Sequence, residues 1–140
     1  MYLKDVLGKR LTNVFVDTRL DVNGLDESDI YLQIDGNTII GFPWDFEDRD
    51  IEKSKPYDAR SIIDFESMNE VTDKKITDFL MYDDPMSTGY FELENGIIVH
   101  EETNFPHGVR GTGFFIIPNI DIFSKRIGDN YLRYTKRSSY

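Results

Sequence analysis

Apolar and polar residues alternate in two segments of the chain, and each segment runs directly into a two-residue turn signal. Residues 30–34 alternate before an Asp-Gly pair at 35–36, and residues 91–94 alternate before an Asn-Gly pair at 95–96. Alternation with a period of two is typical of a strand with one buried face, and both dipeptides favour the tight turns of hairpins. The pattern therefore predicts two β-hairpins.

A second similarity precedes the two hairpins. Residues 3–16 align with residues 68–81 at an offset of 65 positions, with three of the fourteen positions identical and eight more of the same chemical type. Gly8 and Asp73 occupy the same place in the alignment, and both residue types tolerate the backbone of tight turns. We expect a short helical turn to end at each of them and a strand to follow. Chance similarity between two amphipathic segments is the alternative interpretation.

The second of these lead-in segments is ambiguous between strand and helix. Ile76, Phe79 and Leu80 have the spacing of one helix face, with Thr72 in position to cap that helix. The first segment carries two valines at alternate positions, which favour a strand. Because the two segments align, we predict a strand in both.

The remaining segments predict a crossover and a further strand. Residues 43–66 carry many acids and two prolines, which cannot donate ladder hydrogen bonds, so they predict a surface crossover. Residues 61–65, at its end, predict a short strand or a buried turn. Residues 114–117 form a continuous apolar run, which predicts a strand covered on both faces and placed near the middle of the sheet.

These patterns together predict a fold of the α+β class that is mainly antiparallel β, with helix confined to short turns. Two similar β-meander units, residues 2–42 and 67–118, are expected to pack as one domain spanning residues 1–140. The crossover of residues 43–66 joins the units, and a basic tail of residues 124–140 ends the chain.

The composition is that of one globular domain in a reducing compartment. The chain has 140 residues, of which 39% are hydrophobic, and this is enough for one core. The absence of cysteine excludes a disulfide framework, a thiolate zinc site and a cysteine nucleophile. Lys4 and Asp5 interrupt the early apolar stretch, and no apolar run approaches the roughly 18 to 20 residues that span a bilayer. We therefore expect a cytoplasmic protein that is neither exported by a signal peptide nor embedded in a membrane.

The charge is strongly negative and unevenly distributed. Twenty-six acids and sixteen bases give a net charge of -10. Residues 124–140 hold five of the bases and one acid, so the first 123 residues, with eleven bases and twenty-five acids, carry -14. This surplus disfavours nucleic acid and anionic lipid as partners and favours a basic protein.

One segment combines this charge with aromatic residues. Phe42, Trp44 and Phe46 stand at alternate positions beside a run of acids. Either all three rings belong to the core at the end of a strand, or they provide an exposed aromatic anchor ringed by carboxylates, which would suit a basic protein surface. The candidate partner-binding residues, including two acids of a second turn, are Trp44, Asp45, Glu47, Asp48, Asp50, Glu52, Asp83 and Asp84.

A metal site is the main alternative to protein binding. His100, Glu102 and His107 supply imidazole and carboxylate groups, which zinc and iron centres recruit. Their spacing is not that of a helical H-E-x-x-H motif, and metal binding would require the two histidines to face one another across the loop between them. We otherwise expect no cofactor.

Three further patterns give little support to catalysis or nucleic-acid binding. The glycines of residues 107–114 lack the Lys-Ser/Thr pair and the following helix of a phosphate-binding loop. Ser87, Thr88 and Thr112 have no neighbouring base placed by a motif. In residues 126–137 tyrosines are interleaved with bases, as on nucleic-acid surfaces, but a clasp of the tail onto the acidic body of the same chain is at least as consistent with the charges.

In size and composition, this compact acidic chain without cysteine resembles the small immunity proteins with which bacteria neutralise basic nuclease or other toxin domains. The resemblance covers no motif and assigns no residue. It implies a non-enzymatic protein-binding module that acts as an immunity or inhibitor protein toward a basic partner. The alternatives are a small metal-dependent enzyme or metal-binding domain that uses the three ligands named above, and a structural homodimer whose strand edges pair.

Overall fold

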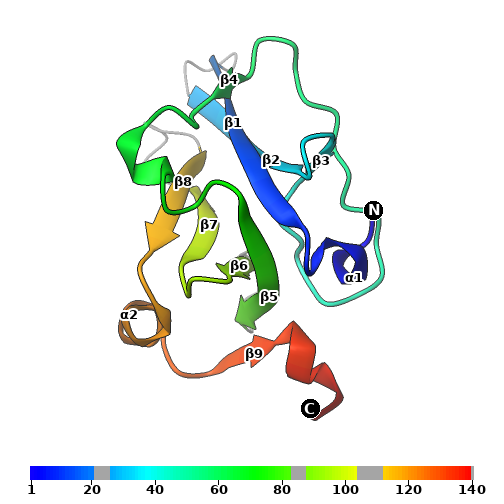
Figure 1. Ribbon diagram of the computed structural model, residues 1–140, viewed down its shortest axis with the longest axis vertical. Coiled ribbons are helices and arrows are strands. Elements are labelled where there is room, and N and C mark those ends of the chain that lie inside the picture. Colours follow the sequence, from blue (N-terminus) through cyan, green and yellow to red (C-terminus); the bar gives the residue numbers. More distant parts are fainter. Residues whose placement is uncertain (21–25, 83–87, 104–111, 140) are drawn as a thin grey trace.

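The computed structural model describes residues 1–20, 26–82, 88–103 and 112–139 (Figure 1). The elements, in chain order, are α1 (Leu3–Val6), β1 (Arg10–Leu20), β2 (Asp26–Ile34), β3 (Thr38–Ile40), β4 (Arg60–Ser61), the 3-10 helix η1 (Glu66–Met68), β5 (Lys74–Tyr82), β6 (Tyr90–Leu93), β7 (Ile98–Thr103), β8 (Thr112–Ile117), α2 (Ile120–Arg126), β9 (Tyr131–Arg133) and the 3-10 helix η2 (Tyr134–Ser139). The predicted fold class is confirmed, because strands dominate and helices are few and short. No helix within the described ranges is long and apolar enough to cross a membrane.

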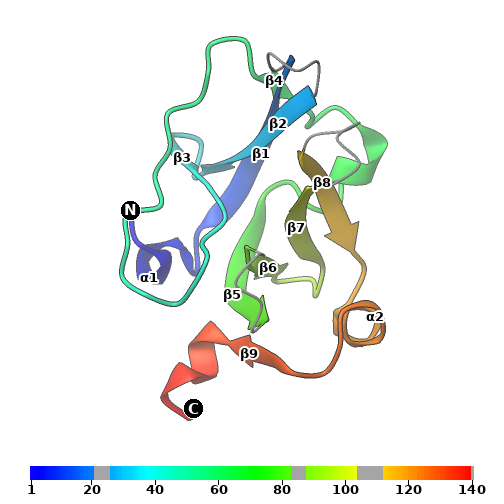
Figure 2. The same cartoon turned by 180° about the vertical axis from the view of Figure 1, so that it is seen from behind.

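All the strand pairs are antiparallel, and they form one curved sheet. The strand order is β3-β2-β1-β5-β6-β7-β8, with β4 beside β1 and β9 beside β5. Strands β2 and β8 are not hydrogen-bonded neighbours, yet they contact one another, so the sheet curls around its interior. Figure 2 shows this arrangement from behind, with α2 lying next to the end of β8.

Both predicted hairpins are confirmed. Strand β2 turns into β3 at Asp35 and Gly36, whose φ angles of 51° and 78° are those of the mirror-image turns that suit hairpins. Strand β6 turns into β7 through Gly96, whose φ is 85°. The local turn chemistry thus sets the register of both hairpins.

The two lead-in segments meet one another at the centre of the sheet. Gly8 and Asp73 have φ angles of 89° and 63°, which agrees with the tight turns expected there. The Gly8 amide donates to the Ile76 carbonyl, and the Asp73 amide donates to the Leu11 carbonyl, each at 2.7 Å. Strand β5 is therefore confirmed as a strand, and its first residues pair with the beginning of β1.

Strands β1 and β5 also have a register shift and a threonine hydrogen bond at corresponding positions. A register shift interrupts β1 between Leu11 and Asn13, and another interrupts β5 between Ile76 and Asp78. Beside these bulges, Thr12 Oγ1 donates to the carbonyl of the next strand at 3.2 Å, and Thr77 Oγ1 does the same at 3.2 Å.

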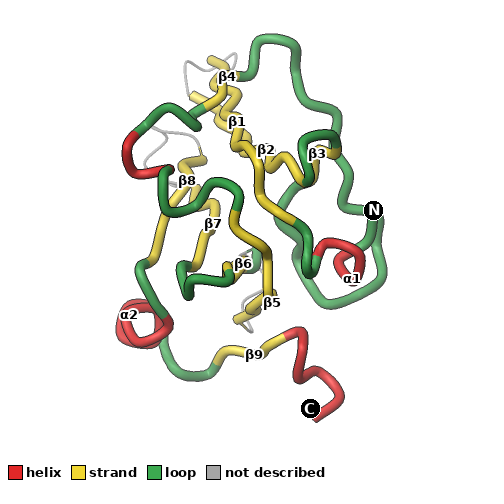
Figure 3. The backbone as a smooth tube through the Cα atoms, viewed as in Figure 1, coloured by secondary structure: helices red, strands yellow, loops and turns green. Residues whose placement is uncertain are grey.

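The predicted crossover leaves β3 and runs along one side of the molecule, past α1, to β4 (Figure 3). Its residues 51–53 lie beside β3, where the Gly41 amide donates to the Ile51 carbonyl at 3.0 Å and the Lys53 amide donates to the Ile39 carbonyl at 2.9 Å. Residues 61–65 were expected to form a short strand or a buried turn, but only Ser61 belongs to a strand, β4, and residues 62–65 form a turn that is half-buried at its start and exposed at its end.

One prediction about the sheet is wrong. Strand β8 contains the apolar run of residues 114–117, but it lies at the end of the strand order and not near the middle. Its apolar residues are explained by packing on both faces: Phe114 and Ile116 pack against the main core, whereas Ile117 belongs to a second cluster with Phe123 of α2. A helix, and not a further strand, covers part of the second face, where Phe115 stays 45% exposed.

Candidate functional site

The three alternating aromatic residues have different surroundings. Phe42 is buried, with its ring centroid 5.4 Å from that of Phe91. Phe46 packs edge-on against Phe79 and Tyr134. Trp44 between them is 60% exposed. The interpretation that places all three rings in the core is therefore wrong for Trp44, which is a surface residue held between two anchored neighbours.

Trp44 lies in the wall of a surface pocket, the Trp44 pocket, which residues 41–45, 47 and 49–53 line. Its volume is about 200 Å³. Four of the predicted partner-binding acids also line it: Asp45, Glu47, Asp50 and Glu52. The Pro43 carbonyl accepts a hydrogen bond of 3.0 Å from the amide of Gly89, the residue before β6, which fixes the start of this segment. The sequence therefore brings an exposed indole and four carboxylates together on one anchored segment.

The amino group of Met1 binds two of these acids. It lies 2.9 Å from an Asp50 oxygen and 3.1 Å from a Glu52 oxygen. A hydrogen bond from the Glu52 amide, followed by the one from the amino group, lowers the pKa of Asp50. The two carboxylates in turn raise the pKa of the amino group. These contacts tie the N-terminus to the crossover.

The other acids of the segment also have nearby cations. Arg49 lies 3.2 Å from Asp45 and 2.7 Å from Glu47, and Lys4 lies 3.9 Å from Asp48. Exposed ion pairs of this kind contribute little to stability, so their carboxylates remain able to exchange partners. The remaining two candidates, at positions 83 and 84, lie outside the described residues.

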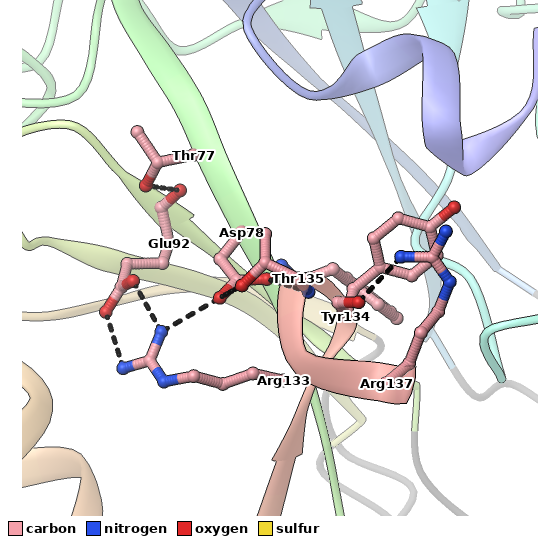
Figure 4. A network of polar contacts seen from close by, with 8 residues as sticks. Thr77, Asp78, Glu92, Arg133, Tyr134, Thr135 and Arg137 are labelled. Carbon is pink, nitrogen blue, oxygen red and sulfur yellow. Dashed lines mark hydrogen bonds and ion pairs between the residues drawn. The ribbon is translucent and has the colours of Figure 1, made fainter. Parts of the chain in front are cut away.

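The basic tail is attached to the body through Arg133, as the intramolecular interpretation expects (Figure 4). Its guanidinium lies 3.0 Å from Asp78 of β5 and 2.8 Å from Glu92 of β6. Thr135 adds two hydrogen bonds to Asp78, from its amide at 3.1 Å and from its hydroxyl at 2.8 Å. The hydrogen bonds to Glu92 and then Asp78 raise the pKa of Arg133. We call these four residues the Arg133 clasp.

His100, the first residue of the metal alternative, is buried in β7. Its Nδ1 lies 3.1 Å from the Gly89 carbonyl oxygen, and its ring stacks on Tyr90 with 3.9 Å between centroids. Burial lowers the pKa of His100 to about 4. Glu102 continues β7, where its backbone pairs with Gly113, but its side chain and the whole of the second histidine, His107, lie outside the description.

The structure gives the metal alternative no further support. Among the described side chains, no group of three or more histidines, aspartates and glutamates is placed to hold a metal ion. The chemistry available at the Trp44 pocket is non-covalent recognition by an indole and carboxylates.

Comparisons of the chain with protein-family models, with curated proteins and with solved structures found no match.

Proposed function

We propose that the protein is a non-enzymatic module that binds a basic protein through the Trp44 pocket. In the more specific form of this proposal, the partner is a basic toxin or nuclease domain, and the chain acts as its immunity or inhibitor protein in the cytoplasm. The observation that carries the proposal is the 60% exposure of Trp44 among the carboxylates that line the same pocket.

Trp44 has the properties of an interface anchor. Tryptophan is enriched among the residues that dominate binding energy, because a large rigid ring buries much area at a low cost in side-chain entropy. Here Phe42 is buried and the half-buried Phe46 packs edge-on against Phe79, so the exposed ring is presented without a need for the backbone to reorganise.

The charges favour a basic partner. Among the described residues, the five crossover acids of the Trp44 segment have three cations within 4 Å, namely Arg49, Lys4 and the Met1 amino group. Lys53 also lines the pocket, so the five acids outnumber these four cations by one. The chain as a whole carries -10. This long-range field accelerates encounter with a positively charged protein and makes the association rate fall with salt.

The first prediction concerns Trp44→Ala. With the wild-type chain immobilised, we expect basic proteins from a lysate to be retained at low salt and released by high salt, and the variant to lose them. For a purified partner, the affinity falls by about thirtyfold or more, because truncating an anchor residue costs about 2 kcal/mol or more. Trp44 is the single tryptophan, so its fluorescence reports the same binding directly.

Phe65→Ala is the matched control for this experiment. Phe65 is also a crossover aromatic and is 63% exposed, but it does not line the Trp44 pocket. We expect its variant to retain the same proteins as the wild type. Retention that is equal in the Trp44→Ala variant, or that is indifferent to salt, contradicts the proposed function.

We also propose that the fold consists of two related meander units. The reciprocal hydrogen bonds of the lead-in segments and the matching register shifts of β1 and β5 support this proposal. So does the position of residues 51–53 beside β3, which corresponds to that of β8 beside β7. Strand β4 beside β1 likewise corresponds to β9 beside β5.

Pairing of strand edges in a homodimer stays a prediction, which sizing in solution tests.

A further inference from the structure

A second pocket lies between the β7–β8 pair and the end of α2, apart from the Trp44 segment. Its volume is about 210 Å³. The lining residues that matter here are Tyr90, His100, Phe115, Ile117, Arg126 and Ile127. We call this site the His100 pocket. A cavity of about 150 Å³ accommodates benzene, so this one has room for a single ring with one or two small substituents.

His100 presents a hydrogen-bond acceptor to this pocket. A carbonyl oxygen only accepts, so the contact between Nδ1 and the Gly89 oxygen requires the proton to be on Nδ1. This assignment leaves a lone pair on Nε2. Among the described residues, every fully buried side-chain nitrogen or oxygen has a hydrogen-bond partner. No described group binds Nε2, so this atom is not fully buried, and the pocket that His100 lines is the opening to which we assign it. Stacking on Tyr90 fixes the plane of the ring.

The rest of the wall is apolar and partly exposed. Phe115 and Ile127 are 45% and 38% exposed, although both are large hydrophobic residues. Tyr90 and Ile117 are buried beside them. A planar apolar ligand that enters this pocket would therefore cover side chains that the fold leaves in contact with water.

Arg126 is the only charged residue among those that line the pocket. None of the ion pairs found between described residues involves its guanidinium. In a chain of net charge -10, an arginine that forms no ion pair with a described acid and lines a largely apolar pocket selects an anionic group. An arginine is especially suited to a carboxylate, which it can bind through two parallel hydrogen bonds.

We infer that the His100 pocket is a binding site for a small aromatic carboxylate that also carries a hydroxyl or N–H group. The ring lies against Phe115, Ile117 and Ile127. The donor group binds His100 Nε2, and the carboxylate binds Arg126. This site is separate from the protein-binding surface proposed above and does not depend on it.

The corresponding place in the first half of the sheet is filled by the chain itself. Gly41, the residue after β3, occupies the position in the first hairpin that His100 occupies in the second. A side chain at Gly41 would collide with Lys53, because a Cβ there would lie 2.5 Å from the Lys53 Cε. The Lys53 ammonium lies over the Tyr31 ring, 5.4 Å from its centroid. A side chain of the crossover thus covers the tyrosine in the first half, whereas the His100 ring stacks on Tyr90 in the second half and itself lines the pocket.

The test uses 4-hydroxybenzoate as the probe and amide NMR shifts of the full chain as the readout. We expect saturable shifts at Phe115, Ile117 and Ile127, with a Kd below about 1 mM for a ligand of this size. Benzoate, which lacks the donor, should bind about tenfold more weakly. Absence of saturable shifts at these amides overturns the inference.

Two variants assign the roles of the polar groups. His100→Phe should abolish the advantage of 4-hydroxybenzoate over benzoate, and Arg126→Gln should weaken both carboxylates about equally while leaving phenol unaffected. Arg137→Ala, a tail arginine remote from the pocket, is the control and should change nothing. If His100→Phe does not fold, the Arg126→Gln comparison still decides: carboxylate binding that is unchanged in this variant contradicts the inference.

Discussion

The Arg133→Ala variant should lose about 3 kcal/mol of unfolding free energy, because it leaves two carboxylates of the clasp without their cation. The side chains of Asp78 and Glu92 are only 5% and 16% exposed, so water replaces the guanidinium poorly. Globular domains are stable by only about 5–15 kcal/mol, so this loss should be plain in urea denaturation followed by circular dichroism.

Arg137→Ala is the matched control for this prediction. Arg137 belongs to the same tail, lies over the Tyr134 ring with 3.9 Å to its centroid, and donates to the Tyr134 carbonyl, but none of its described contacts is an ion pair with an acid. We expect this variant to lose about 1 kcal/mol or less, as is usual for an exposed cation over a ring. A loss as large as that of Arg133→Ala would show that the tail is held by packing and not by the clasp.

The first half of the sheet suggests a rescue. Asn13 and Gln33 occupy positions in β1 and β2 that correspond to Asp78 and Glu92, and there the Ser61 hydroxyl donates to Asn13 Oδ1 at 2.7 Å. The triple variant Asp78→Asn, Glu92→Gln and Arg133→Met makes the clasp neutral, as the corresponding residues of the first half are. Because replacing a buried ionic group entirely is often close to neutral, its stability should return to within about 1 kcal/mol of the wild type. Failure of this rescue would place the cost of Arg133→Ala in lost packing.

The hairpins were predictable because their determinants are local. The Asp35-Gly36 and Asn95-Gly96 pairs favour turns whatever the rest of the chain does, and the flanking alternation fixes which face is buried. The local amino-acid sequence is therefore sufficient to predict the two hairpins.

Strand β5 was harder to predict because it is buried on both faces. Phe79 belongs to the main core and the next residue, Leu80, belongs to the cluster under α2, so the apolar positions no longer alternate. The resulting spacing fits one face of a helix. Only the alignment with residues 3–16 favoured a strand, which is the structure observed.

The exposure of Trp44 could not be read from the alternation of aromatic residues. Alternation places residues on one face only within a strand, whereas residues 41–46 belong to no strand and residues 44–46 form a bend. The charges indicated a clasp of the tail onto the acidic body, but not which residues form it, because the clasp depends on contacts over long sequence separations, such as the 55 residues between Arg133 and Asp78. The place of β8 at the end of the strand order was not predicted either. The open acceptor of His100 likewise follows only from its bond to Gly89.

Acidification from pH 7 to pH 4 should destabilise the protein by about 3 kcal/mol through His100 alone. Burial lowers its pKa from 6.5 in an unfolded chain to about 4 in the native state. Between these values the unfolded chain binds a proton that the native state does not, so stability is complete above pH 6.5 and declines as the pH falls toward 4. A difference of about 2.5 pKa units corresponds to about 3 kcal/mol.

Other groups titrate in the same range, so the His100→Phe variant is needed to isolate this contribution. Burial raises the pKa of Glu101, which favours the native state on acidification and opposes the effect of His100. Subtracting the pH dependence of the variant from that of the wild type removes Glu101 and the remaining carboxylates. The difference should be flat above pH 6.5 and grow steadily below it. A difference that is flat down to pH 4 would mean that the imidazole accepts its second proton in the native state, with Nε2 hydrated well enough to carry the charge.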